Sequence, residues 1–184
     1  MNLHNALMTR RTFHHYQPGA VPQEVVDRAL EAAHQAPCHK HTWPWRFTMA
    51  GPQARQALVP LGIALKEKKK TLNDTARMAI TAKLSNPDRL VVVSVVRTDN
   101  AFQAREDYAA ASCAIQNMHL SVHADGYGAK WSSGGITSHA KTYEILGIDP
   151  QIEEIIGFVW IGVPGNDPPK VARPGLETVV RQTD

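Results

Sequence analysis

The sequence predicts an α+β fold in which a mixed central β-sheet is flanked by helices. Several segments carry apolar residues at helical spacing, and a few β-branched or aromatic segments have the character of strands. The strands are few and irregularly spaced along the chain, which argues against a regular doubly wound sheet. A length of 184 residues suits one domain with its own core, and no repeat or linker divides the chain. We therefore expect a single domain over residues 1–184.

The first two helices are predicted at residues 2–9 and 22–35. The first has apolar residues at helical spacing and ends at the pair Arg10-Arg11. The second begins with a proline, which suits the first position of a helix, and continues with one apolar face. Pro37 prevents its continuation, so residues 36–44 are expected to form a polar, aromatic loop.

The middle of the chain is predicted to contain two strands and three helices. Residues 45–49 and the β-branched apolar run 89–97 have strand character, and the second run is expected to be buried. Helices are predicted at 53–70, 74–83 and 104–125. The third is apolar nearly all round, which predicts a central, buried helix. One of its faces carries Tyr108, Ala111, Ile115, Met118 and Val122.

In the last third of the sequence we predict a short strand at 129–131, a turn at 132–135, a helix at 139–146 and a buried strand at 155–163. Four prolines between 164 and 174 exclude a helix or a central strand there. We expect this tail to wrap over a surface, either its own or that of a neighbouring chain.

Composition argues against several classes of protein. The net charge is only +3, and the lysine cluster at 66–70 has no aromatic partners, which disfavours a nucleic-acid-binding protein. Arg10-Arg11 is not followed by the apolar stretch of an export signal, and the run Leu90 to Val96 is too short to span a membrane. Two cysteines, Cys38 and Cys113, make no disulfide framework. We expect a cytoplasmic protein with neither a nucleic-acid nor a membrane partner.

Two cationic segments are candidate anion sites. Arg10-Arg11-Thr12 offers guanidinium groups beside a hydroxyl, which suits a phosphate. Cations at the C-terminal end of a helix also interact favourably with the helix dipole, so these arginines could serve only the helix. Spacing alone favours the dipole interpretation. In the tail, Lys170 and Arg173 either complete an anion site or are solvated, and solvation is the more common outcome.

Two further segments suit a flat ligand. The loop at 37–45 combines His39, Lys40, His41 and Trp43, which favours stacking and hydrogen bonds to a ring. A metal site using His34, His39 and His41 with Cys38 lacks the necessary spacing and carboxylates, so no metal is expected. Residues 128–135 end a strand and can present backbone N–H groups, but they also fit an ordinary turn. A dinucleotide fingerprint is absent because Trp131 stands where its third glycine belongs.

Taken together, these segments resemble the flavin-dependent nitroreductases, over nearly the whole chain. Each motif is weak alone, but six in the family's order and spacing are specific. The motifs are Arg10-Arg11-Thr12, Ala36-Pro37-x-His39-Lys40-x-x-x-Pro44-Trp45-x-Phe47, Glu106-Asp107, Gly126-Tyr127-Gly128-x-x-Trp131-x-Ser133-Gly134, Ile156-Gly157-Phe158-x-x-x-Gly162-x-Pro164 and Arg173-Pro174-x-Leu176-Glu177.

The resemblance implies a homodimer with flavin mononucleotide (FMN) at the interface, reduced by NADH or NADPH and reoxidised by a small acceptor such as a nitroaromatic or a quinone. The positions that it assigns to FMN are Arg10, Arg11, Thr12, Gln35, His39, Trp131, Ser132, Ser133 and Arg173. Lys40 and Trp43 fall on the substrate side. Gln35 stands where close relatives tend to have arginine, and Trp43 stands where glutamine or asparagine is commoner, so Trp43 would narrow the substrate side.

On this hypothesis the flavin carries the hydride chemistry and the protein supplies no nucleophile. A cation near the ring edge that becomes negative on reduction would favour the reduced state, and Arg10, Arg11 and Lys40 are the candidates. Two alternatives stay open. One is a flavoprotein of the same fold with another reaction, such as a dehalogenase or an enoate-type reductase, and the other is a non-catalytic flavin-binding module.

Overall fold

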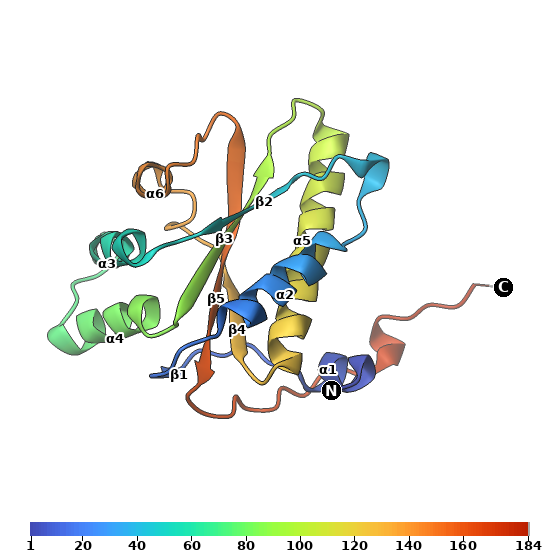
Figure 1. Ribbon diagram of the computed structural model, residues 1–184, viewed down its shortest axis with the longest axis horizontal. Helices are drawn as coiled ribbons and strands as arrows, with labels where there is room; N and C mark the ends of the chain where they lie inside the picture. The colour runs from blue at the N-terminus through green and yellow to red at the C-terminus, as the bar shows by residue number, and fades with distance from the viewer. Residues whose placement is uncertain (184) are drawn as a thin grey trace.

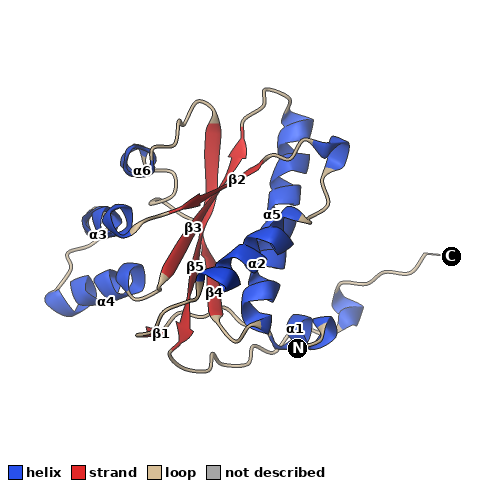
Figure 2. Cartoon of the chain, viewed as in Figure 1, coloured by secondary structure: helices blue, strands red, loops and turns tan. Residues whose placement is uncertain are grey.

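The computed structural model describes residues 1–183 and contains a five-stranded sheet with helices on both faces (Figures 1 and 2). The strands are β1 (Tyr16–Gln17), β2 (Trp45–Met49), β3 (Arg89–Val96), β4 (Gly128–Ser132) and β5 (Glu153–Pro164). The helices are α1 (Leu3–Thr9), α2 (Gln23–His34), α3 (Pro52–Glu67), α4 (Asp74–Ser85), α5 (Ala101–Ala124) and α6 (Ala140–Leu146). Two 3-10 turns, η1 (His39–His41) and η2 (Leu176–Thr178), complete the described elements.

The sheet has the order β1-β5-β3-β2, and β4 also pairs with β5. Each of these strand pairs is antiparallel. Parallel pairing occurs only as an isolated bridge between Thr12 and Ala129 among the residues described. The α+β class is confirmed, and the expected mixing of strand directions is limited to this one bridge.

Strand β3 is buried on both faces because helices cover both sides of the sheet. Val91 and Val93 pack in the cluster formed with α2 and α5, whereas Leu90 and Val92 pack in the cluster formed with α3, α4 and α6. This alternation follows from the two-residue period of a strand. It explains why β3 reads as a continuous apolar run, and the predicted burial is confirmed. Figure 2 shows the two helical layers on opposite sides of the strands.

Helix α5 is buried along one face only, which corrects the expectation of a helix buried all round. The buried residues of α5 are Asp107, Ala110, Ala111, Ala114, Ile115, Met118, His119 and Val122. Tyr108, expected among them, is 49% exposed, and Ala109 and Cys113 are also exposed. The sheet and α2 cover α5 from one side, α1 and η1 contact it near its two ends, and Tyr108, Ala109 and Cys113 stay exposed. A small-residue and apolar face is therefore left open.

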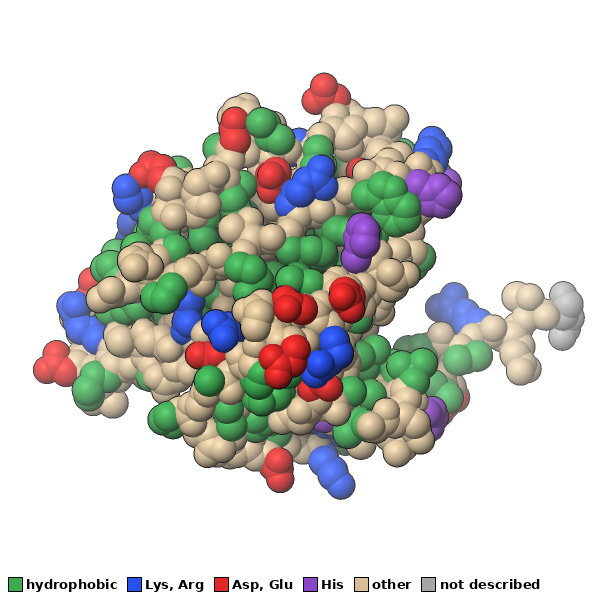
Figure 3. All heavy atoms as spheres, in the orientation of Figure 1, with side chains coloured by type: hydrophobic (Ala, Val, Ile, Leu, Met, Phe, Trp, Pro, Cys, Tyr) green, Lys and Arg blue, Asp and Glu red, His purple; other side chains and the backbone are tan. Residues whose placement is uncertain are grey.

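The segment after β5 leaves the body of the molecule, with its end extended into solvent (Figures 1 and 3). From Gly165 to Thr183 nearly every described residue is exposed, and the apolar Leu176 and Val179 are 75% and 76% exposed. The expectation that prolines exclude a helix or a central strand is confirmed for 165–174 and is wrong for Pro164, which is the last residue of β5 and pairs with Tyr16. None of the described helices combines the length and apolarity needed to cross a membrane.

Candidate functional site

The end of α1 is fastened beside β4 by backbone contacts. Thr12 forms the parallel bridge with Ala129, and the N–H of Phe13 donates to the Ala129 carbonyl at 3.2 Å. Gly128 makes room for this approach, since a Cβ at that position would lie 2.8 Å from the Phe13 ring. The segment Arg10 to Thr12 is therefore held at a fixed place next to the strand that the sequence associates with a flat ligand.

A cavity of about 290 Å³, here called the outer cavity, lies between this segment and the start of the tail. Its lining residues are Arg10, Arg11, Thr12, His14, Pro168, Pro169, Val171 and Arg173. The structure thus brings together two cationic segments that lie at opposite ends of the sequence. The prolines keep the tail extended, and this conformation carries Arg173 back to the end of α1.

The outer cavity is strongly cationic. Burial, followed by the charges of Arg173 and Arg11, lowers the pKa of Arg10. Within the described chain, neither Arg10 nor Arg173 has a hydrogen bond or an ion pair through its guanidinium group. Arg11 is different, because its Nη1 donates to the carbonyls of Met8 and Arg10 at 2.9 and 2.8 Å. Arg11 therefore caps α1, and Arg10 and Arg173 remain as paired donors that suit a phosphate.

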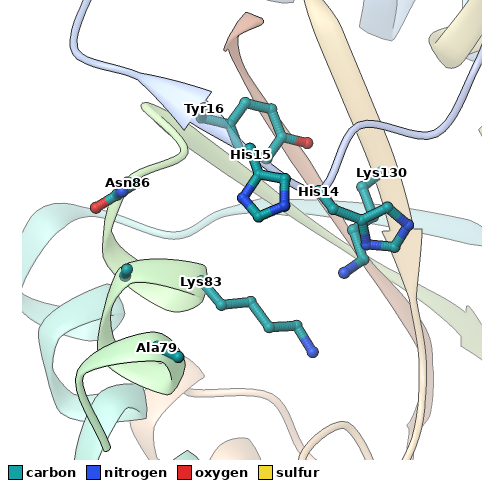
Figure 4. A pocket seen from close by; sticks show the side chains of 8 residues that line it. His14, His15, Tyr16, Ala79, Lys83, Asn86 and Lys130 are labelled. Atoms are coloured by element: carbon teal, nitrogen blue, oxygen red, sulfur yellow. The ribbon is translucent and has the colours of Figure 1, made fainter. Parts of the chain in front are cut away.

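A second cavity, here called the inner cavity, has a volume of about 460 Å³ and adjoins the outer one, because His14 lines both. Its lining residues are His14, His15, Tyr16, Ala79, Ala82, Lys83, Asn86 and Lys130. Figure 4 shows the Lys83 side chain extending from α4 below the two histidines, and Lys130 of β4 lying beside His14. Burial and the charge of Lys83 lower the pKa of Lys130 to about 8. Burial, followed by Lys130, also lowers the pKa of His14.

The end of β4 is fixed by its neighbours on β5. The Trp131 indole lies directly over Gly157, where a Cβ would be 1.9 Å from Nε1, and Nε1 donates to the Ile156 carbonyl at 3.4 Å. The Ser132 hydroxyl accepts a hydrogen bond from Trp160 Nε1 at 3.0 Å, and this bond links the end of β4 to β5. Ser133 is exposed. Trp131 and Ser132 are therefore held in place by β5, and they follow Lys130, which lines the inner cavity.

The aromatic loop lies at the other end of α5. Thr42 donates to Asp107 Oδ1 at 2.7 Å, and Gln103 donates to the same oxygen at 2.8 Å. His41 and Trp43 stack with ring centroids 5.4 Å apart. Lys40, His41 and Trp43 all have positive φ, between 46° and 55°, a region that non-glycine residues rarely adopt. A buried carboxylate therefore anchors a loop with a costly backbone conformation.

One chain does not bring all the expected site residues together. Thr9 Oγ1 bonds His123 Nε2 at 2.9 Å, which places the outer cavity near one end of α5, whereas Thr42 bonds Asp107 near the other. Asp107 and His123 are about 24 Å apart along the helix axis, at 1.5 Å per residue. His39, Lys40 and Trp43 line neither the outer nor the inner cavity. Gln35 lies in a third, shallow hollow between α1, α2 and α5.

Sequence reasoning missed the inner cavity. Lys83, Lys130 and His14 come from three separate elements, and no motif links them. The only available signal was their charge, which is also that of ordinary surface residues. No group of three or more metal-ligating His, Cys, Asp or Glu side chains occurs among residues 1–183.

Comparison with known proteins places the chain among proteins with this architecture. A model of the nitroreductase family matches residues 7–163. YdjA of Escherichia coli strain K12, provisionally named an NAD(P)H nitroreductase, is 27% identical over 161 residues, or 86% of each chain. YfhC of Bacillus subtilis strain 168, named in the same way, is 26% identical over 168 residues, which cover 90% of this chain and 86% of YfhC.

Solved structures agree in fold. A nitroreductase-like family protein from Bacillus cereus superposes with a TM-score of 0.87 at 24% identity, covering 100% of this chain and 97% of the other. A protein from Desulfovibrio desulfuricans, provisionally named a nitroreductase and crystallised with FMN, gives a TM-score of 0.78 at 24% identity over 99% and 97% of the two chains. The family match over residues 7–163 and the shared fold lead to one conclusion: the chain belongs to the nitroreductase family.

Proposed function

We propose that the protein is an FMN-dependent NAD(P)H oxidoreductase that transfers hydride through a bound flavin to a small acceptor, such as a nitroaromatic or a quinone. The observation that carries this proposal is the outer cavity, in which Arg10 and Arg173 converge beside Thr12 without a described carboxylate. A phosphate monoester fits this donor set, because guanidinium groups match phosphate oxygens in pairs. Family membership and relatives named as NAD(P)H nitroreductases favour the same reaction class.

In this proposal the residues of the chain bind and orient the cofactor. Arg10, Arg173 and Thr12 hold the phosphate, and His14 lies where the outer and inner cavities meet. Trp131 and Ser132 offer a fixed edge for the ring because Gly157 and Trp160 hold them in place. When bound, FMN supplies two-electron hydride chemistry. No acid or base side chain of the protein is required for that transfer.

We also propose that the working unit is a homodimer in which each flavin contacts both chains. Gln35, His39, Lys40 and Trp43 lie apart from the two cavities of their own chain, so a second copy must supply them if they contact flavin or acceptor. The open face of α5 and the exposed apolar residues of the tail give such a partner a surface to cover. The stacked rings of His41 and Trp43 would then lie on the acceptor side of the flavin, where Trp43 would narrow the space that is open to the acceptor.

The test is the visible absorption spectrum of the purified protein with FMN, before and after NADH or NADPH is added without oxygen. We expect a bound flavin spectrum that bleaches, and reoxidation by a quinone or a nitroaromatic compound. A protein that binds no FMN contradicts the proposal. A flavin that binds but is not reduced by either nucleotide favours a non-catalytic module. A reduced flavin that passes electrons only to a halogenated or enoate compound favours another reaction on the same fold.

A further inference from the structure

The aromatic loop, residues 36–44, is attached to α5 at a buried carboxylate. Asp107 is only 5% exposed and belongs to no ion pair in the described part of the chain. Its Oδ1 accepts hydrogen bonds from Thr42 Oγ1 at 2.7 Å and from Gln103 Nε2 at 2.8 Å. Figure 1 shows the loop beside the first turns of α5. A buried carboxylate is costly without donors, so Asp107 favours the loop position that supplies Thr42.

The hydroxyl of Thr42 connects Asp107 with the backbone of Trp43. Thr42 has one hydroxyl proton, which goes to Asp107, so the 3.3 Å contact between Thr42 Oγ1 and Cys38 Sγ uses the thiol as donor. The N–H of Trp43 donates to the same sulfur at 3.3 Å. The three hydrogen bonds therefore run in one direction, from Trp43 to the carboxylate at the end.

The backbone of this loop needs such an anchor. Lys40, His41 and Trp43 have φ values of 55°, 52° and 46°, in the left-handed region, whereas Thr42 between them has an ordinary φ of −71°. Residues other than glycine keep such a conformation only where the surrounding structure enforces it. The bond to Asp107 does so at the centre of the loop, because it ties Thr42 to a buried side chain of another element.

This conformation fixes two rings at the surface, here called the ring stack. The rings of His41 and Trp43 have centroids 5.4 Å apart and planes 9° apart, and Trp43 is 45% exposed. Trp43 also meets the ring of Trp45, which is 4% exposed, at 5.9 Å. Trp45 is held in turn by a hydrogen bond from its Nε1 to His34 Nδ1 at 3.1 Å. A flat ring surface is therefore exposed in one fixed orientation.

A fixed, flat surface selects ligands by the area of their rings. A fused-ring compound covers more of an indole than a single ring does, and stacking becomes more favourable with the area that it buries. A mobile ring would lose much of this advantage, because ordering it on binding costs conformational entropy. The ring stack therefore suits a flat ligand with two or more fused rings.

We propose that Asp107 is a positioning residue for acceptor selection: through Thr42 it keeps the ring stack in the orientation that favours fused-ring acceptors over single-ring ones. This rests on the proposed function, in which the ring stack lies on the acceptor side of the flavin. Asp107 lines neither the outer nor the inner cavity. Its effect should therefore appear with the acceptor, and not in FMN binding or in flavin reduction by NAD(P)H.

The test compares kcat/KM for naphthoquinone with kcat/KM for benzoquinone in the FMN-loaded protein. The ratio is compared between variants, so that the different reactivities of the two quinones cancel. Thr42→Val removes the hydroxyl at nearly constant volume and should lower the ratio about tenfold, through a higher KM for naphthoquinone. Thr42→Ser keeps the hydroxyl and should retain the ratio. The control is Thr81→Val, at an exposed position of α4 where the hydroxyl bonds only to its own helix, and it should also retain the ratio.

Asp107→Asn tests the carboxylate itself. The amide keeps an oxygen that accepts a hydrogen bond but carries no charge, so we expect a smaller fall in the ratio than in Thr42→Val. In the Asp107→Asn background, Thr42→Val should lower the ratio by less than it does in wild type, because the two residues share one bond. Fully additive effects would show that Thr42 acts without Asp107 and would overturn the assignment.

The indole N–H signals in an NMR spectrum of the FMN-loaded protein report the loop without turnover. The chain has four tryptophans, at positions 43, 45, 131 and 160. Thr42→Val should shift the signals of Trp43 and Trp45 and leave those of Trp131 and Trp160, on β4 and β5, in place. Thr42→Ser should leave all four in place.

An unaltered quinone ratio in Thr42→Val overturns the proposal and leaves the proposed function intact, whether or not the indole signals shift. An equal loss for both quinones and for flavin reduction by NAD(P)H also overturns it, because the bond would then support only the fold. If wild type itself binds no FMN, the proposed function is wrong and this proposal is overturned with it.

Discussion

His119 is a buried imidazole near the cationic end of α1. Its side chain is on the buried face of α5, and Nε2 has no hydrogen-bond partner in the described structure. Burial, followed by the charge of Arg10, lowers its pKa to about 4. The ordinary value for histidine is about 6.5. His119 is therefore neutral in the folded protein at neutral pH, and protonating it opposes folding.

This shift predicts a loss of stability in acid. Between about pH 6.5 and pH 4 the unfolded chain binds a proton at His119 and the folded chain does not, so the free energy of unfolding decreases as pH falls through this window. The full effect is about 3 kcal/mol. His119→Gln should remove this part of the pH dependence, and His4→Gln, at an exposed position, should retain it. Urea unfolding at pH 7 and pH 4.5 measures the difference. Identical pH dependence in wild type and His119→Gln would show that His119 does not contribute.

Gly157 makes the packing of Trp131 possible. A Cβ there would lie 1.9 Å from Trp131 Nε1, closer than any real contact. Gly157→Ala should therefore displace the indole and destabilise the protein by about 1–3 kcal/mol, which is typical of overpacking. Gly135→Ala is the matched control, because nothing lies within 4 Å of the place that its new methyl group would take and its φ is ordinary. Thermal unfolding of the two variants compares them, and equal melting temperatures would contradict this account of Gly157.

At the scale of elements, Arg55 of α3 holds the turn between α4 and β3. Its guanidinium donates to the carbonyls of Ser85, Pro87 and Asp88, the first at 3.1 Å. This turn ends the helix that carries Lys83 and starts the central strand β3. The three carbonyls therefore depend on one side chain for their hydrogen bonds.

Arg55→Met should lower the free energy of unfolding by about 1–3 kcal/mol, the cost of leaving polar groups without partners. The comparison is Arg77→Met, which breaks only a partly exposed ion pair with Glu67 and should cost about 0–1 kcal/mol. Equilibrium unfolding in urea distinguishes the two. If Arg55→Met is no more harmful than Arg77→Met, the carbonyls are satisfied by solvent and Arg55 does not hold the turn.

The elements that the sequence predicted well are those whose pattern is local. Strand β2 was predicted at 45–49, as found, and β3 differs by one residue at its end. The helices α2 and α4 agree within a few residues because proline or a polar residue marks their ends. By contrast β1 has only two residues, and its pairing with Val163 and Pro164 is a tertiary contact that no local pattern encodes.

The site was less predictable than the fold for a related reason. The grouping of Arg10 with Arg173 was suggested only by the resemblance to a family, since spacing alone favoured a helix cap and a solvated tail. The structure brings both arginines to one cavity but uses Arg11 as the cap. The grouping of Lys83 and Lys130 could not be predicted from the sequence, because their cavity forms only when α4 and β4 pack together. The roles of Arg10 and Arg173 toward flavin stay predictions, as does the single domain over 1–184.

At the scale of the whole molecule, the tail connects the outer cavity with the outside of the chain. Arg173 lines the cavity, and Leu176, Val179 and Val180 follow it as exposed apolar residues. Exposed apolar groups of this kind favour contact with another chain. In the proposed dimer, the tail therefore takes part in both cofactor binding and assembly.

A chain that ends after Gly165 should lose both properties. We expect it to bind FMN more weakly and to form a weaker dimer than the full chain at the same concentration. Arg173→Ala in the full chain should weaken FMN binding by about tenfold or more, from the loss of a charged hydrogen bond, and should still form the dimer. Light scattering gives the mass, and flavin fluorescence gives the affinity. A truncated chain that keeps both the dimer and the affinity would exclude the tail from both.

The aromatic loop has a consequence for how the protein can be changed. Lys40, His41 and Trp43 occupy a backbone region that glycine adopts freely, and such positions cost about 1–3 kcal/mol each for other residues. Glycine at these three places would leave the course of the loop intact at lower conformational energy. A variant stabilised in this way would keep the path of the loop but lose the side chains of Lys40, His41 and Trp43, which are the groups that the proposed function uses.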